Sequence, residues 1–168
     1  IVTCLALLVL AAVYVTHHYD AAFPQASLSL PLSPDAITGK AEAFLRSRGL
    51  VPTADFRNLT LFDPDELARL YLERELGIEK ANELMSGTVP VWRWRARWFQ
   101  PPEKEERIVW LRPDGGLTGF EHRILDTAPG RKLDRASARL LAKAFLDAQT
   151  SVPHELIAEE SVDRPNRT

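Results

Sequence analysis

The chain has 168 residues, a net charge of −2 and 45% hydrophobic residues, the size and balance of one globular domain or two small ones. The near-neutral charge excludes a global field that attracts nucleic acid. The single cysteine, Cys4, excludes an internal disulfide framework.

The N-terminal segment is apolar without interruption. Residues 1–16, IVTCLALLVLAAVYVT, contain no charged residue, glycine or proline, and the polar and aromatic HHYD follows. A membrane-spanning helix needs about 20 apolar residues, and aromatic residues suit the membrane–water interface. The pattern predicts a transmembrane anchor over 1–19 and an extended linker over 20–32. A signal peptide cleaved within YDAAFPQA is the alternative, since that segment offers small residues for cleavage.

The first predicted helix after the linker lies between Ser33 and Gly49. Ser33 is a favourable N-cap, Pro34 suits the first helical position, and Gly49 is a typical stop. Apolar residues recur through the segment at helical spacing: Ala36, Ile37, Ala41, Phe44 and Leu45. A short strand is predicted over residues 55–62, where apolar side chains alternate imperfectly.

Two further helices are predicted over residues 63–87. In DPDELARLYLERELG, Asp63 is the expected N-cap, Pro64 the first helical residue and Gly77 the end. A shorter helix, IEKANELMSG, follows it. Apolar residues of these helices are expected to pack on a sheet: Leu67, Leu70, Tyr71 and Leu84.

The sheet is predicted to begin in VPVWRWRARWF, residues 89–99, where tryptophan and arginine alternate. Strand periodicity separates the two types onto opposite faces: Trp92, Trp94, Ala96 and Trp98 on one, and Arg93, Arg95 and Arg97 on the other. A nucleic-acid surface needs basic and aromatic side chains on the same face. We therefore interpret the tryptophans as core residues and expect no nucleic-acid partner. The arginine row is a candidate interaction surface for anionic lipid headgroups or a partner. Neighbouring glutamates also offer it cross-strand ion pairs.

Further strands and a helix complete the predicted elements. Two β-rich runs flank the turn residues Asp114 and Gly115, so residues 89–124 are predicted to form three consecutive antiparallel strands. Asp134 is the expected cap of a helix that ends near residue 149. Its buried stripe is predicted to contain Leu141, Ala144 and Phe145, and a strand is predicted in HELIAEESV, residues 154–162.

An internal repeat relates the two capped helices. When Ser33 is aligned with Asp134, AEAFL meets AKAFL, and Val51-Pro52 meets Val152-Pro153 without a gap. Similar composition of two amphipathic helices is the alternative, but the shared Val-Pro lies outside them. The alignment predicts one unit over 33–130, with inserted helices at 63–87, and a second, incomplete unit over 131–168. Because a lone helix and strand cannot bury their apolar faces, we expect the natural protein to continue beyond residue 168.

Both units resemble a known extracytoplasmic domain. The capped A-x-A-F-L helix, followed by three antiparallel strands containing GGLTGF, is similar to PepSY-type units, which occur in tandem. VPVWRWRARWFQP, GFEHRI, LDRASARLLAKAFL and EESVDRPNRT resemble the region preceding the membrane domain of bacterial CPBP-type intramembrane metalloproteases. The resemblance, over residues 33–168, implies an α+β fold with helices on an antiparallel sheet. It also implies a periplasmic or extracellular location and the membrane domain of the same chain as a partner.

The resemblance to these proteases directs attention to catalytic motifs. The family carries Glu-Glu-x-x-x-Arg and histidines on apolar membrane helices, and EESVDR at residues 159–164 matches the first pattern literally. That segment is polar and is followed by Pro165, so we reject it as an active site. No catalytic residue, cofactor or metal site is assigned here, and whether the parent protein is an enzyme stays open.

The expected role is that of a non-catalytic, extracytoplasmic regulatory or substrate-presenting domain of a membrane protein, namely a CPBP-type intramembrane protease. The alternative is a free-standing, membrane-tethered binding module or protease inhibitor. Either role implies a membrane partner through the N-terminal helix and a peptide or protein ligand.

Overall fold

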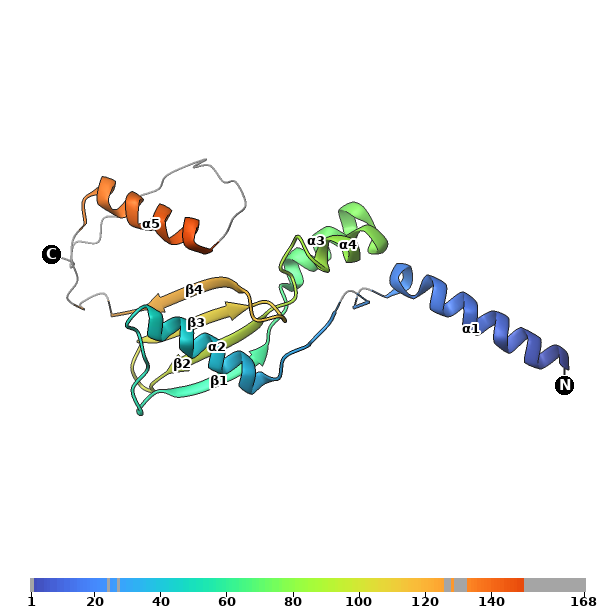
Figure 1. The fold of residues 1–168 in the computed structure, drawn as a ribbon, viewed down its shortest axis with the longest axis horizontal. Coiled ribbons are helices and arrows are strands. Elements are labelled where there is room, and N and C mark those ends of the chain that lie inside the picture. Colours follow the sequence, from blue (N-terminus) through green and yellow to red (C-terminus); the bar gives the residue numbers. More distant parts are fainter. Residues whose placement is uncertain (1, 24, 27, 126–127, 129–132, 150–168) are drawn as a thin grey trace.

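The computed structural model describes residues 2–23, 25–26, 28–125, 128 and 133–149, and its class is α+β (Figure 1). Within these residues the elements, in chain order, are α1 (Val2–Ala22), α2 (Pro34–Ser47), β1 (Arg57–Phe62), α3 (Glu66–Leu76), α4 (Ile78–Met85), β2 (Trp94–Phe99), β3 (Glu106–Leu111), β4 (Leu117–Arg123) and α5 (Arg135–Gln149). The strand predicted at 154–162 and the EESVDR segment lie outside the described residues.

The N-terminal helix α1 projects away from the rest of the molecule (Figure 1). Its window Val2–Tyr19 has a mean hydropathy of 1.6 and no part of it is buried inside the protein. By length and composition α1 is able to cross a membrane, and a signal sequence at an N-terminus meets the same criterion. The helix continues to Ala22, slightly beyond the anchor predicted over 1–19.

The four strands form an antiparallel meander in the order β1-β2-β3-β4. The three consecutive strands predicted between residues 89 and 124 are therefore confirmed as β2, β3 and β4. The predicted turn after β3 is also confirmed, since Arg112 N donates to Gly116 O at 2.7 Å. Gly115 within it has φ +90°, a conformation that side-chain-bearing residues rarely adopt.

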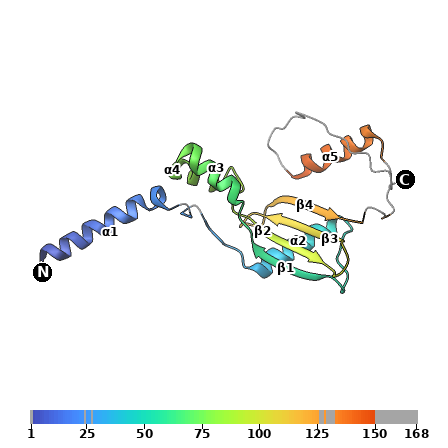
Figure 2. The ribbon, with the colours of Figure 1, turned by 180° about the vertical axis from the view of Figure 1, so that it is seen from behind.

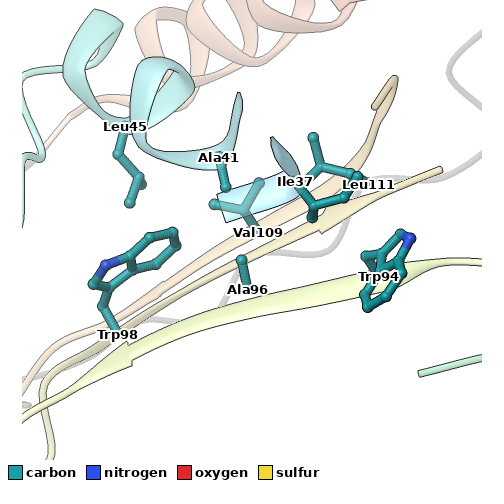
Figure 3. Close-up of a cluster of buried hydrophobic side chains, with 8 residues drawn as sticks. All are labelled: Ile37, Ala41, Leu45, Trp94, Ala96, Trp98, Val109 and Leu111. Atoms are coloured by element: carbon teal, nitrogen blue, oxygen red, sulfur yellow. The ribbon is translucent and has the colours of Figure 1, made fainter. Parts of the chain in front are cut away.

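Helix α2 covers one face of this sheet, and their contact is the main core (Figure 3). The predicted cap is confirmed because Ala36 N donates to Ser33 Oγ at 3.3 Å. Three fully buried residues of α2 face buried side chains of β2 and β3 across the interface: Ile37, Ala41 and Leu45 against Trp94, Ala96, Trp98, Val109 and Leu111. The small Ala41 and Ala96 leave room for the two indoles on either side of them (Figure 3).

Helices α3 and α4 pack on each other, and the expected packing of three α3 residues on the sheet is wrong. Leu67, Leu70 and Tyr71 are 82%, 53% and 65% exposed. The residues that α3 turns inward are Ala68 and Leu72. They pack against a second core cluster of Ala81, Met85, Val91 and Trp92. Leu84 of α4 is half-buried.

The start of α3 also differs from its prediction. The N-cap is Asp65, whose Oδ1 accepts from Ala68 N at 3.1 Å, and the helix begins at Glu66. Asp63 cannot serve as the cap because its amide still extends the sheet ladder, donating to Arg93 O at 2.9 Å. Gly77 ends the helix as predicted, with φ +79°.

Helix α5 begins after the predicted cap, and Asp134 Oδ1 accepts from Ser137 N at 2.9 Å. The predicted burial of Leu141 and Ala144 is wrong, because both are exposed in the described part of the chain. Phe145 is half-buried, with the Arg48 guanidinium 4.7 Å above its ring. The internal repeat and its unit boundaries stay predictions.

Candidate interaction surface

The alternation of tryptophan and arginine follows the two faces of β2, as predicted. Trp94 and Trp98 are 7% and 3% exposed under α2, whereas Arg95 and Arg97 are half-buried on the opposite face. Trp92 is also buried, but it precedes β2 and belongs to the cluster around α4. Trp92, Trp94 and Trp98 are therefore core residues that no ligand on the arginine face can contact.

The face opposite α2, which we call the open face, is defined by three cross-strand rows. Its residues come from the strand register: Leu61, Arg95, Trp110 and Gly119; Leu59, Arg97, Ile108 and Glu121; and Arg57, Phe99, Glu106 and Arg123. In the described part of the chain, the helix that packs across these strands is α2, on the other side. The open face therefore presents apolar, aromatic and ionised side chains together.

Each of the three predicted arginines has a carboxylate partner within the domain. The pairs are Arg93 Nη1 with Asp65 Oδ2 at 3.2 Å, Arg95 Nε with Asp63 Oδ2 at 3.3 Å, and Arg97 Nε with Glu106 Oε2. The glutamate partner belongs to the set expected from neighbouring strands. The two aspartates were missed, because their segment was assigned to the start of a helix. The backbone hydrogen bond from Asp63 N to Arg93 O holds the segment with these two aspartates beside the arginines.

Glu106 is the centre of the densest charge cluster on the open face. It is 8% exposed and accepts from Arg97 Nε and, at 2.5 Å, from Arg123 Nη1. Burial alone would raise the pKa of this carboxyl, but the hydrogen bonds from Arg97 and Arg123 outweigh it and lower the pKa below its ordinary value. Arg123 also pairs with Glu121. The cluster therefore holds compensated charge and does not offer free cations.

Apolar side chains on the open face lie between these charges. Leu59 is 43% exposed, and it sits opposite Arg97 in the register. Trp110 is half-buried and lies opposite Gly119, where an added Cβ would be 3.1 Å from the indole Cε3. The glycine therefore lets the indole lie close to the strand backbone, which resembles the pairing of aromatics with glycine in designed sheets.

A pocket of about 550 Å³ opens beside the Glu106 cluster. Phe99 and the Pro101–Pro102 turn between β2 and β3 form its apolar wall. The charged residues that line it are Arg97, Glu103, Lys104, Glu106 and Arg123. Its size is within the range of small-ligand sites, and its mixture of an aromatic and fixed charges suits a peptide side chain.

A second ionic cluster, missed from sequence, lies on the α2 side of the sheet. Glu105 Oε1 accepts from Arg107 Nη2 at 2.7 Å and lies 3.0 Å from His122 Nε2. The Arg107 guanidinium is 4.5 Å above the ring of Phe56. These contacts stabilise the end of the sheet. Across the described residues, no three His, Cys, Asp or Glu side chains are grouped so as to hold a metal ion.

Comparison of the chain with family models, with curated proteins and with solved structures gave no match in any of the three. The PepSY-like and CPBP-like features therefore rest on the sequence motifs alone.

Proposed function

We propose that the chain is a non-catalytic regulatory or substrate-presenting domain, held at the extracytoplasmic surface of a membrane by α1. The observation that carries the proposal is the open face, a mixed apolar and ionic sheet surface on a domain attached to a membrane-length helix. The sequence resemblance places such a domain before the membrane part of a CPBP-type intramembrane protease, which would then be its partner.

The electrostatics of the open face favour a peptide or protein ligand. Arg93, Arg95 and Arg97 are neutralised by carboxylates of the same domain. To bind any of these three arginines a polyanion would have to break its ion pair, whereas an apolar peptide can contact Leu59 and Trp110 without disturbing the pairs. Ion pairs that are already formed also hold the arginine side chains in place, which lowers the entropy lost on binding.

Binding of unlabelled peptides to the full chain in nanodiscs tests this role. We expect peptides with apolar side chains from a random library to bind, and Leu59→Thr to weaken their binding by about tenfold, the equivalent of one good apolar contact. Threonine keeps the strand propensity, and Leu59 is exposed, so the fold should be unaffected. The dissociation constants are measured by titration.

Val51→Thr is the matched control, because Val51 is 51% exposed but lies in the α2–β1 connection and not in the sheet. It should leave peptide affinity unchanged. Equal affinities for the Leu59→Thr variant and the wild type would contradict binding at the open face. Cleavage of the peptides by the purified chain would contradict a non-catalytic role.

A further inference from the structure

Helix α3 carries an exposed apolar stripe that no described element covers. The α3 stripe consists of Leu67, Leu70 and Tyr71, and Arg74, 86% exposed at its side chain, continues it toward the C-terminal end. These positions follow helical spacing and share one side of the helix. Ala68 and Leu72 on the other side pack into the second core cluster. The stripe is therefore the outer side of a helix that is already folded and anchored.

The position of α3 in the molecule indicates what this stripe meets. Figures 1 and 2 both show α3 and α4 between α1 and the sheet. Helix α4 contacts α1, and Asn82 Nδ2 of α4 donates to Phe23 O, just beyond α1, at 2.9 Å. Because α3 packs on α4, it lies about one helix diameter, roughly 10–12 Å, from the end of the anchor.

The end of α1 has the composition of a membrane–water boundary. Tyr19, the last residue of the apolar window, stacks on Phe23 with the ring centroids 4.7 Å apart. Tyrosine and other aromatic rings favour the headgroup level of a bilayer. A bilayer that encloses α1 would therefore have its surface at the level of the α3–α4 pair.

We propose that the α3 stripe inserts into the headgroup region of the bilayer that α1 spans, so that the domain rests on the membrane at a fixed tilt. The inference goes beyond the proposed function but depends on its membrane anchoring. Leucine and tyrosine on one side of a short helix are suited to this shallow depth. The anchor keeps α3 beside the bilayer, and this high effective concentration makes a small stripe sufficient.

Lipid fits the stripe better than a second copy of the chain. A stable protein interface buries about 800 Å² on each partner, which three side chains do not supply. Charge contributes little, because both arginines of α3 have carboxylates close by. Arg69 is paired with Glu66 and Glu73 at 2.7 and 2.6 Å, and Arg74 Nε lies 4.0 Å from Glu75 Oε1. We therefore expect the insertion to occur in zwitterionic phosphatidylcholine and to be insensitive to salt.

A single environment-sensitive fluorophore attached to cysteine tests the inference on the full chain. Cys4, the only cysteine, lies in α1 and reports anchoring directly. Cys4→Ser combined with Leu70→Cys reports the α3 stripe. Cys4→Ser combined with Thr118→Cys, an exposed position on β4, reports bulk water. Each labelled protein is reconstituted in phosphatidylcholine vesicles, with quenchers placed on the lipid chains or dissolved in water.

The label at position 70 is expected to be quenched by a shallow lipid quencher and to lose about half of the iodide quenching seen at position 118, as for an interfacial residue. Adding Leu67→Ser and Tyr71→Ser should raise the iodide quenching of the label at position 70 to the level seen at position 118, whereas adding Val51→Ser should not. Equal iodide quenching at positions 70 and 118, with Cys4 buried in lipid, would overturn the inference while leaving the anchor intact. A water-exposed Cys4 label would instead refute the anchoring on which the proposed function depends. Self-quenching at position 70 that disappears when empty lipid is added would show that a second copy covers the stripe.

Discussion

Trp94→Ala is expected to lower the free energy of unfolding by about 3–5 kcal/mol, the usual cost of removing a buried tryptophan. Trp94 is 7% exposed, packs in the main core under α2, and meets the ring of Phe62 edge-on at a centroid distance of 5.4 Å. Alanine would leave a cavity that the fully buried Ile37 and Ala96 cannot fill. Urea unfolding in detergent micelles, followed by far-ultraviolet circular dichroism, measures the change.

Two controls separate packing from other effects of this substitution. Trp94→Phe keeps most of the apolar ring and removes an indole Nε1 that has no hydrogen-bond partner among the described residues, so it should cost much less than alanine. Arg95→Ala changes the adjacent residue on the open face. Because the Arg95–Asp63 pair is 36% and 33% exposed, its loss should cost about 0–1 kcal/mol. A stable Trp94→Ala protein that has lost peptide binding would overturn the assignment of Trp94 to the core.

The central part of the fold could be predicted because local sequence signals there agree with one another. Ser33 and Pro34 mark the start of α2, Gly115 marks the hairpin, and strict alternation assigns each side chain of β2 to a face. Side chains alternate between the two faces of any β-strand, whichever strands pair with it. The separation of tryptophans from arginines could therefore be predicted directly from the sequence.

The wrong predictions concern segments whose local sequence pattern does not specify which surface the segment packs against. The DPD segment fits a helix cap at either aspartate, and only the ladder contact of Asp63 with Arg93 selects Asp65. Leu67 and Tyr71 have the spacing of a buried stripe, yet α3 packs Ala68 and Leu72, both half-buried, against the second core cluster. For the same reason the ion pairs of Arg93 and Arg95 could not be predicted, since their partners depend on how β1 leads into α3.

Glu106→Gln is expected to lower the free energy of unfolding by about 1–2 kcal/mol at pH 7. Hydrogen bonds to charged groups contribute about 1.5–3 kcal/mol, and solvent screening reduces this, because Arg97 and Arg123 are 38% and 54% exposed. Glutamine keeps the shape of the side chain but removes the charge that these two arginines neutralise. Chemical unfolding of the variant and the wild type at several pH values measures the difference.

The pH dependence of this difference follows from the direction of the pKa shift. Arg97 and Arg123 hold the pKa of Glu106 below its ordinary value of 4.5, so the unfolded state binds the proton first as the pH falls. The stabilisation is therefore complete above about pH 4.5 to 5 and is lost as the pH falls through the folded-state pKa. The wild type should then approach the Gln variant in stability.

Glu103→Gln, at an exposed position of the preceding turn, is the control and should change stability by less than about 0.5 kcal/mol throughout the pH range. A gap between the wild type and Glu106→Gln that persists unchanged at the acid end would show that the stability difference does not come from the charge of Glu106.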